Sequence, residues 1–153
     1  NDLDQLLNNL DRLVVASTDG EINSELILQN IEQSTDESVF RILESALANN
    51  YDEAFLVLEN ELRKGTTPIA LVGIFISQLT IVYQAKTLRQ QFLEPQIVKF
   101  LKVHPYRVKL ALQSKLALGQ VRSLLQELIE LDYQYKSGQA HDASALKIFI
   151  LKI

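Results

Sequence analysis

Apolar and polar positions along this chain recur with the period of an α-helix. From Leu3 to Val15 the apolar residues return every three or four positions, and later segments repeat this spacing. The pattern predicts nine helices, at about residues 3–15, 24–31, 36–48, 53–64, 69–91, 96–102, 106–116, 120–135 and 143–152. No segment keeps the alternation of a strand, so we predict an all-α fold with no sheet.

Residues that favour turns and caps separate these segments. Gly65 follows basic residues at a predicted helix end, and Pro68, Pro95 and Pro105 stand where new helices are expected to start. Asn49-Asn50 is expected to end a helix, and the caps predicted for later starts are Asp52, His104 and Asp142.

A polar stretch at residues 33–36, Gln-Ser-Thr-Asp, predicts a hinge between two helices. We place the main domain boundary there, because residues 1–34 carry too few apolar positions to fold independently. Residues 35–153 then form the main domain. The chain begins with Asn1 rather than Met, so we expect it to be a piece of a longer protein.

The segment from Ile69 to Tyr83 is apolar almost all round and is expected to start the longest, central and most buried helix. Residues 84–91 are polar on most faces and should reach solvent. Ser77, Gln78 and Thr80 interrupt the apolar tract, so we predict no membrane span, and no signal peptide opens the chain.

Charge is distributed unevenly along the sequence. Residues 1–61 carry 14 acidic and 2 basic residues, whereas residues 62–153 carry 5 acidic and 13 basic ones. No acid lies between Pro95 and Gln126, a stretch that contains six cations: Lys99, Lys102, Arg107, Lys109, Lys115 and Arg122. Such polarity is typical either of a charged partner or of two solvated faces of opposite sign.

Motifs for catalysis, metals and cofactors are not found. The chain has no Cys, and neither His104 nor His141 has a second ligand at metal-binding spacing. Residues 63–67, Arg-Lys-Gly-Thr-Thr, are better explained as a helix end than as a phosphate loop, because the earlier glycine and the preceding strand are missing. We therefore predict no catalytic, cofactor or metal site.

Residues 95–116 have the pattern of a short basic helix, a break and a second short basic helix. This is typical of a helix-turn-helix DNA reader, and equally of an αα-hairpin with its Lys and Arg side chains outside. A small helical DNA-binding protein that uses this unit is therefore an alternative function.

Several short motifs, taken in order, resemble one family, the delta subunit of bacterial DNA polymerase III, over its C-terminal part. They are Asp19-Gly20-Glu21-Ile22; residues 40–47, Phe-Arg-Ile-Leu-Glu-Ser-Ala-Leu; Asn50-Tyr51-Asp52-Glu53-Ala54; Pro68-Ile69-Ala70-Leu71 with Gln78 and Ala85-Lys86; His104-Pro105-Tyr106-Arg107-Val108-Lys109; and residues 132–138, Asp-Tyr-Gln-Tyr-Lys-Ser-Gly. No single motif is diagnostic, and the ordered set carries the resemblance.

The resemblance implies a helical collar domain at residues 35–153, preceded at residues 1–34 by the last helices of an AAA+-like lid. In that family the collar holds delta in a ring with delta-prime and tau/gamma while the sliding clamp is loaded during DNA replication. The clamp-opening element belongs to the N-terminal part, which this chain lacks, so contact with the clamp is expected only through that part.

The same resemblance implies a non-catalytic subunit of a DNA-directed DNA polymerase, a nucleotidyltransferase holoenzyme, in the bacterial cytoplasm. No membrane contact is expected, and contact with DNA is expected to be indirect at most. The residues expected to face a partner or DNA are the six cations of the acid-free stretch, Lys99, Lys102, Arg107, Lys109, Lys115 and Arg122.

Overall fold

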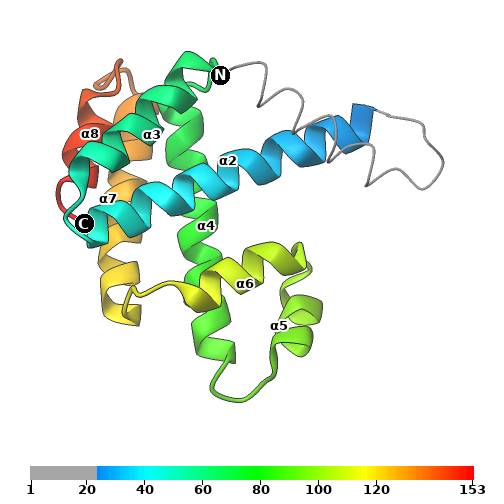
Figure 1. The fold of residues 1–153 in the computed structure, drawn as a ribbon. Helices are drawn as coiled ribbons and strands as arrows, with labels where there is room; N and C mark the ends of the chain where they lie inside the picture. The colour runs from blue at the N-terminus through cyan, green and yellow to red at the C-terminus, as the bar shows by residue number, and fades with distance from the viewer. Residues whose placement is uncertain (1–23) are drawn as a thin grey trace. The chain divides into compact units, whose positions relative to one another are not determined.

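The computed structural model describes residues 24–153, and side chains from residue 34 onward. Contacts divide the chain into two units, residues 1–37 and residues 38–153. The described part is helical, with seven helices and no strand, so the predicted fold class is confirmed there (Figure 1). The helix predicted at residues 3–15 lies outside the described residues.

Helix α2 runs from Ser24 to Leu47 without interruption, so the hinge predicted at residues 33–36 is wrong. Gln, Ser, Thr and Asp lower helix stability by only a few tenths of a kcal/mol each, and no Gly or Pro lies nearby to break the helix. Two predicted helices therefore join, and α2 rather than the apolar helix is the longest. The domain boundary after residue 34 stays a prediction.

Helix α3, Tyr51–Arg63, returns antiparallel to the second half of α2 (Figure 1). Asn49 adopts a left-handed conformation with φ of 57° at the end of α2. The side chain of Asn50, not the predicted Asp52, caps α3, and its Oδ1 accepts a hydrogen bond from the N–H of Glu53 at 3.3 Å. The cap falls two residues early because Asn binds the free N–H groups of a first turn as well as Asp does.

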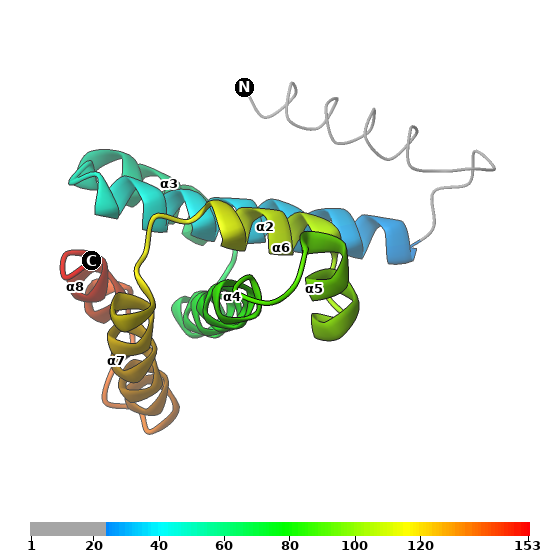
Figure 2. The ribbon, with the colours of Figure 1, turned by 90° about the horizontal axis from the view of Figure 1, so that it is seen from below.

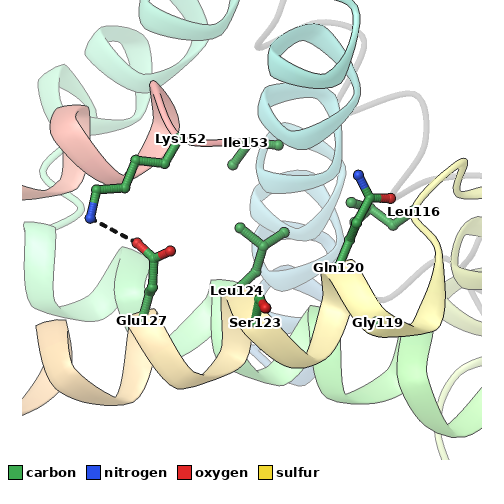
Figure 3. A pocket seen from close by; sticks show the side chains of 8 residues that line it. All are labelled: Leu116, Gly119, Gln120, Ser123, Leu124, Glu127, Lys152 and Ile153. Atoms are coloured by element: carbon green, nitrogen blue, oxygen red, sulfur yellow. Dashed lines mark hydrogen bonds and ion pairs between the residues drawn. The ribbon is translucent and has the colours of Figure 1, made fainter.

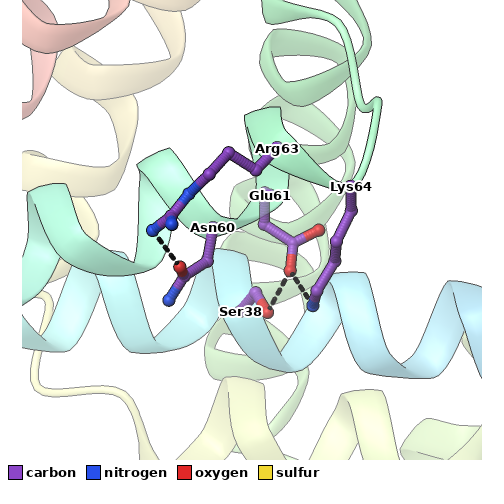
Figure 4. A network of polar contacts seen from close by, with 5 residues as sticks. All are labelled: Ser38, Asn60, Glu61, Arg63 and Lys64. Atoms are coloured by element: carbon purple, nitrogen blue, oxygen red, sulfur yellow. Dashed lines mark hydrogen bonds and ion pairs between the residues drawn. The ribbon is translucent and has the colours of Figure 1, made fainter. Parts of the chain in front are cut away.

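A buried carboxylate fixes the register of α2 against α3. Glu61, 2% exposed, accepts hydrogen bonds from Ser38 Oγ and Lys64 Nζ, both at 2.8 Å (Figure 4). Arg41 and Glu53 form a second ion pair between the same helices. The two contacts hold the hairpin at both ends, and the partners of Glu61 compensate for burying its charge.

Helix α4, Pro68–Leu88, forms the centre of the core. Pro68 is its first residue, as predicted, and Thr67 caps it. Leu71, Val72 and Phe75 have no exposed surface. α4 is the helix of the described part whose length and composition would let it cross a membrane, but its packing inside the domain accounts for its apolar character.

Four further helices pack around α4: α5, Glu94–Leu101; α6, Pro105–Gln113; α7, Leu118–Lys136; and α8, Ser144–Ile150. Figure 2 looks along α4 and shows α7 on one side of it and α5 on the other. Lys86, near the end of α4, donates to the carbonyls of Ser114 and Leu116, just before α7 begins. The end of α4 therefore lies beside the start of α7, and the two helices run antiparallel.

The predicted ends of these later helices are partly confirmed. His104 caps α6, since its Nδ1 accepts a hydrogen bond from the N–H of Tyr106 at 3.2 Å. Asp142 accepts one from the N–H of Ser144 at 2.9 Å at the start of α8. Gly119, expected to precede a helix, instead lies in the first turn of α7, where an exposed glycine is tolerated.

Candidate interaction surface

Part of the charged surface of the described residues is internally paired. Five basic side chains form ion pairs with carboxylates: Arg41 with Glu53, Lys64 with Glu61, Lys136 with Asp132, Lys147 with Glu59, and Lys152 with Glu127. These pairs join neighbouring helices or successive turns of one helix. Their cations are therefore already engaged within the domain.

Five of the six predicted interface residues behave differently. Lys99, Lys102, Lys109, Lys115 and Arg122 are exposed. No side chain of residues 34–153 forms an ion pair or hydrogen bond with any of their charged groups. Lys115 is held only through its backbone N–H, which lies 3.5 Å from Glu44 Oε1. These unpaired cations lie on α5, the link from α5 to α6, α6, the loop after α6 and the start of α7.

Arg107, the sixth predicted residue, is half-buried and lies between α6 and α4. Its Nε and Nη2 donate to Gln78 Oε1 at 3.3 and 3.2 Å, and Nη2 also donates to Ser77 Oγ at 2.9 Å. Gln78 has no exposed surface, and no atom of the described residues forms a hydrogen bond with its Nε2. Arg107 thus ties α6 to the central helix, which the charge pattern did not indicate. A role in partner binding stays a prediction.

The predicted helix-break-helix unit exists as α5 and α6, joined through Lys102, which has a left-handed φ of 53°. Val108 and Ala111 of α6 are buried, and the exposed side chains of that helix are Pro105, Lys109 and Gln113. A DNA-reading helix needs several polar side chains aimed at base edges. α6 exposes only two polar side chains, Lys109 and Gln113, and both lie on one narrow stripe.

A shallow cleft lies between the start of α7 and the C-terminal residues (Figure 3). It has a volume of about 290 Å³. Its polar groups include Glu127 and Lys152, which are 2.9 Å apart and bind each other. Because these charges satisfy each other, the cleft presents no convergent set of free polar groups to a ligand.

Titratable groups with shifted pKa values lie at helix ends and helix pairs. The hydrogen bond from Lys147 lowers the pKa of Glu59, and the backbone N–H of Ser144 lowers that of Asp142. Burial raises the pKa of Tyr135, whose hydroxyl donates to the carbonyl of Asp142 at 2.5 Å. In residues 34–153 no three His, Asp or Glu side chains gather where they could hold a metal ion. The pKa shifts of Glu59 and Asp142 are caused by hydrogen bonds, and that of Tyr135 is caused by burial.

The apolar helix also has a feature that the sequence prediction missed. Residues Ile69 and Tyr83 are exposed, at 36% and 39%, although their segment was expected to lie in the most buried helix. They lie seven residues either side of the half-buried Ile76. This spacing, visible in the sequence, places the three residues on one face of α4 but does not show whether that face is buried or open.

Comparison with known proteins gives this domain a family. The family model for the C-terminal domain of the DNA polymerase III delta subunit matches residues 36–153. The chain belongs to this family. DNA polymerase III subunit delta of Bacillus subtilis (strain 168) is 26% identical over 136 residues, which cover 87% of this chain and 39% of that protein. The resemblance seen in the sequence motifs is thereby confirmed.

The fold agrees with a solved member of the delta family. The Bacillus subtilis DNA clamp loader delta protein matches with a TM-score of 0.75 at 23% identity, covering 98% of this chain and 45% of that one. At this identity the likeness shows a shared fold. The chain spans less than half the length of either relative.

Proposed function

We propose that this chain is a non-catalytic part of a DNA polymerase III clamp loader. In this proposal the helical domain, residues 35–153, is the collar that holds delta in a ring with delta-prime and tau/gamma. The observation that carries the proposal is the family match over residues 36–153. Residues 1–34 are assigned to the end of an AAA+-like lid, and the site of action is the bacterial cytoplasm.

The unpaired cations support a role in assembly. A collar subunit has a different neighbour on each flank, so its two flanks need not be alike. Lys99, Lys102 and Lys109 are exposed and have no acidic partner in the described part of the chain. A neighbour with an acidic surface would pair with them, which increases the rate and specificity of association more than its final affinity.

DNA binding through α5 and α6 is the second candidate, and the same three lysines favour it. Phosphate contacts predict an affinity that falls steeply with salt, whereas apolar protein contacts are far less sensitive. Direct contact with DNA would place these helices near the DNA path of the loaded clamp. Salt dependence therefore separates the two candidates.

The test is the charge reversal Lys99→Glu, Lys102→Glu and Lys109→Glu in one variant of the full chain. The matched control, with the same change in net charge, reverses Arg41, Lys136 and Lys152, which are exposed but already paired. Affinities for the C-terminal domains of delta-prime and tau/gamma, and for duplex DNA, are measured at 50 and 300 mM salt.

Assembly through these lysines predicts that the test variant binds a partner domain at least tenfold more weakly, while the control is nearly unchanged. If the test variant binds the partner domains and DNA as tightly as the unaltered chain does, these lysines are not part of the interface. Salt-dependent DNA binding by the unaltered chain, with no affinity for either domain, would instead favour the DNA-binding candidate.

A further inference from the structure

Within the described residues, one side of α4 is open along its length, and no residue of α4 on that side is charged. The Arg107 guanidinium of α6 reaches the edge of this side, where Nη2 donates to Ser77 Oγ at 2.9 Å. Its residues are exposed or half-buried: Ile69, Ala70, Gly73, Ile76, Ser77, Thr80, Tyr83, Gln84 and Thr87. The one charged residue of α4, Lys86, points elsewhere, because its ammonium binds the carbonyls of Ser114 and Leu116. At 1.5 Å per residue the strip is about 28 Å long. Surfaces depleted of charge are typical of interface centres.

The strip has the spacing of a helix-packing seam. Ile69, Ile76 and Tyr83 recur every seven residues, and the small residues Gly73 and Thr80 lie four positions after the first two. Spacings that alternate between four and three residues are typical of helices that pack side by side along their length. A Cβ added at Gly73 would meet no atom within 4 Å, so a close approach there is open.

Helix α7, which packs beside α4, adds apolar surface (Figure 2). Ile129 and Tyr133 are 61% and 59% exposed and lie one turn apart. They follow Leu125, which is half-buried, at helical spacing. Ser123 and Glu127, on the opposite flank of the buried stripe of α7, line the cleft at the C-terminal residues. The apolar flank is therefore separate from that cleft.

Arg122 indicates the chemistry of the occupant. It lies one turn before Leu125 on the apolar flank of α7, is exposed, and has no ion pair in the described residues. An occupant that carried a carboxylate opposite Arg122 would pair with it. Apart from Arg107 at Ser77, no cation lies on the strip, and its Ile69, Ile76 and Tyr83 seam is apolar, so the strip suits an apolar helix better than a phosphate backbone.

We infer that the open face of α4, with the Ile129–Tyr133 flank of α7, is the docking site for an α-helix of a neighbouring clamp-loader subunit. That helix presents apolar side chains every three or four residues and an acidic residue at its edge. The inference rests on the proposed function and adds to it the surface and the partner element. It is separate from the lysines of α5 and α6.

The test uses the full chain with Gly73→Glu, which places a charge in the seam. Glu forms helix better than Gly, and the added side chain has open space, so the fold is kept. The matched control is Gly119→Glu, also a helical glycine with open space but on the cleft side of α7. Thermal unfolding of both variants verifies that each folds as well as the unaltered chain.

Binding to the C-terminal domains of delta-prime and tau/gamma is then measured by titration calorimetry. We expect Gly73→Glu to weaken one of the two complexes at least tenfold and Gly119→Glu to change it less than twofold. If the unaltered chain binds a domain and both variants bind equally well, the docking face is wrong while the proposed function stands. A chain that binds neither domain contradicts the proposed function.

Self-association is the remaining outcome. If the unaltered chain forms a dimer at the concentrations used, and Gly73→Glu makes it monomeric, then a second copy of this chain occupies the face. That result would overturn the assignment of a neighbouring subunit.

Discussion

Arg107 shows how a basic residue in a charge-rich stretch can be part of the core rather than the surface. Its side chain binds Gln78 and Ser77 across the α4–α6 contact, whereas Lys109, two residues later, is exposed. The sequence places both in one cationic stretch. Only the packing of α6 on α4, which depends on residues 29 positions apart, distinguishes the two.

We predict that Arg107→Ala lowers the free energy of unfolding by about 1–3 kcal/mol, because it leaves the buried Gln78 carbonyl without its donor. Lys109→Ala should change it by less than about 0.5 kcal/mol. Urea unfolding measures both. In the double variant Arg107→Ala with Gln78→Leu, part of the lost stability should return. Equal losses of stability in Arg107→Ala and Lys109→Ala would contradict the structural role of Arg107.

The lowered pKa values of Glu59 and Asp142 predict how stability depends on pH. Because the folded state holds these carboxyls deprotonated to lower pH than the unfolded state does, their contribution is present above the unfolded pKa of about 4. It is lost as the pH falls through the folded pKa. The melting temperature should fall more steeply below pH 4 in the unaltered chain than in Glu59→Gln.

The control for that pH series is Glu130→Gln, which removes an exposed carboxyl that has no partner in the described residues. It should melt with the same pH dependence as the unaltered chain. A Glu59→Gln profile parallel to that of Glu130→Gln would mean that the Lys147 contact does not contribute.

At the scale of helices, the starts at Pro68 and His104-Pro105 were predictable, because proline and capping residues act locally. The hinge at residues 33–36 was not a true break, since polar residues permit a helix that other contacts favour. The open face of α4 could not be recognised as open, because apolar residues look alike whether their partner is the core or another subunit.

Two glycines should respond oppositely to substitution. Gly65 ends α3 with φ of 97°, so Gly65→Ala strains the backbone and should destabilise the chain by about 1–2 kcal/mol. Gly119 lies within α7 with no neighbour at its Cβ position, and Gly119→Ala should stabilise by up to about 1 kcal/mol. Thermal unfolding gives both signs, and a stabilising Gly65→Ala would contradict the turn geometry.

For the whole molecule, the sequence predicted the helical class and the family, since both follow from patterns that extend over the full chain. That the six cations face a partner or DNA stays a prediction. Five of them are exposed and have no ion pair in the described residues, while Arg107 binds Gln78 of α4. What emerges is a domain with a closed core, an uncharged seam on α4 and free cations on α5 and α6. We propose that the seam and the free cations are surfaces for binding other macromolecules.

The central claim is that this chain binds neighbouring subunits through its helical domain. Light scattering after size exclusion of the chain mixed with the C-terminal domains of delta-prime and tau/gamma tests it most directly. We expect the 17.4 kDa chain to elute with at least one domain, at the summed mass of both. The mixture is run at concentrations well above those at which a functional complex forms. If all three proteins then elute separately at their own masses, the claim that this chain binds neighbouring subunits is contradicted.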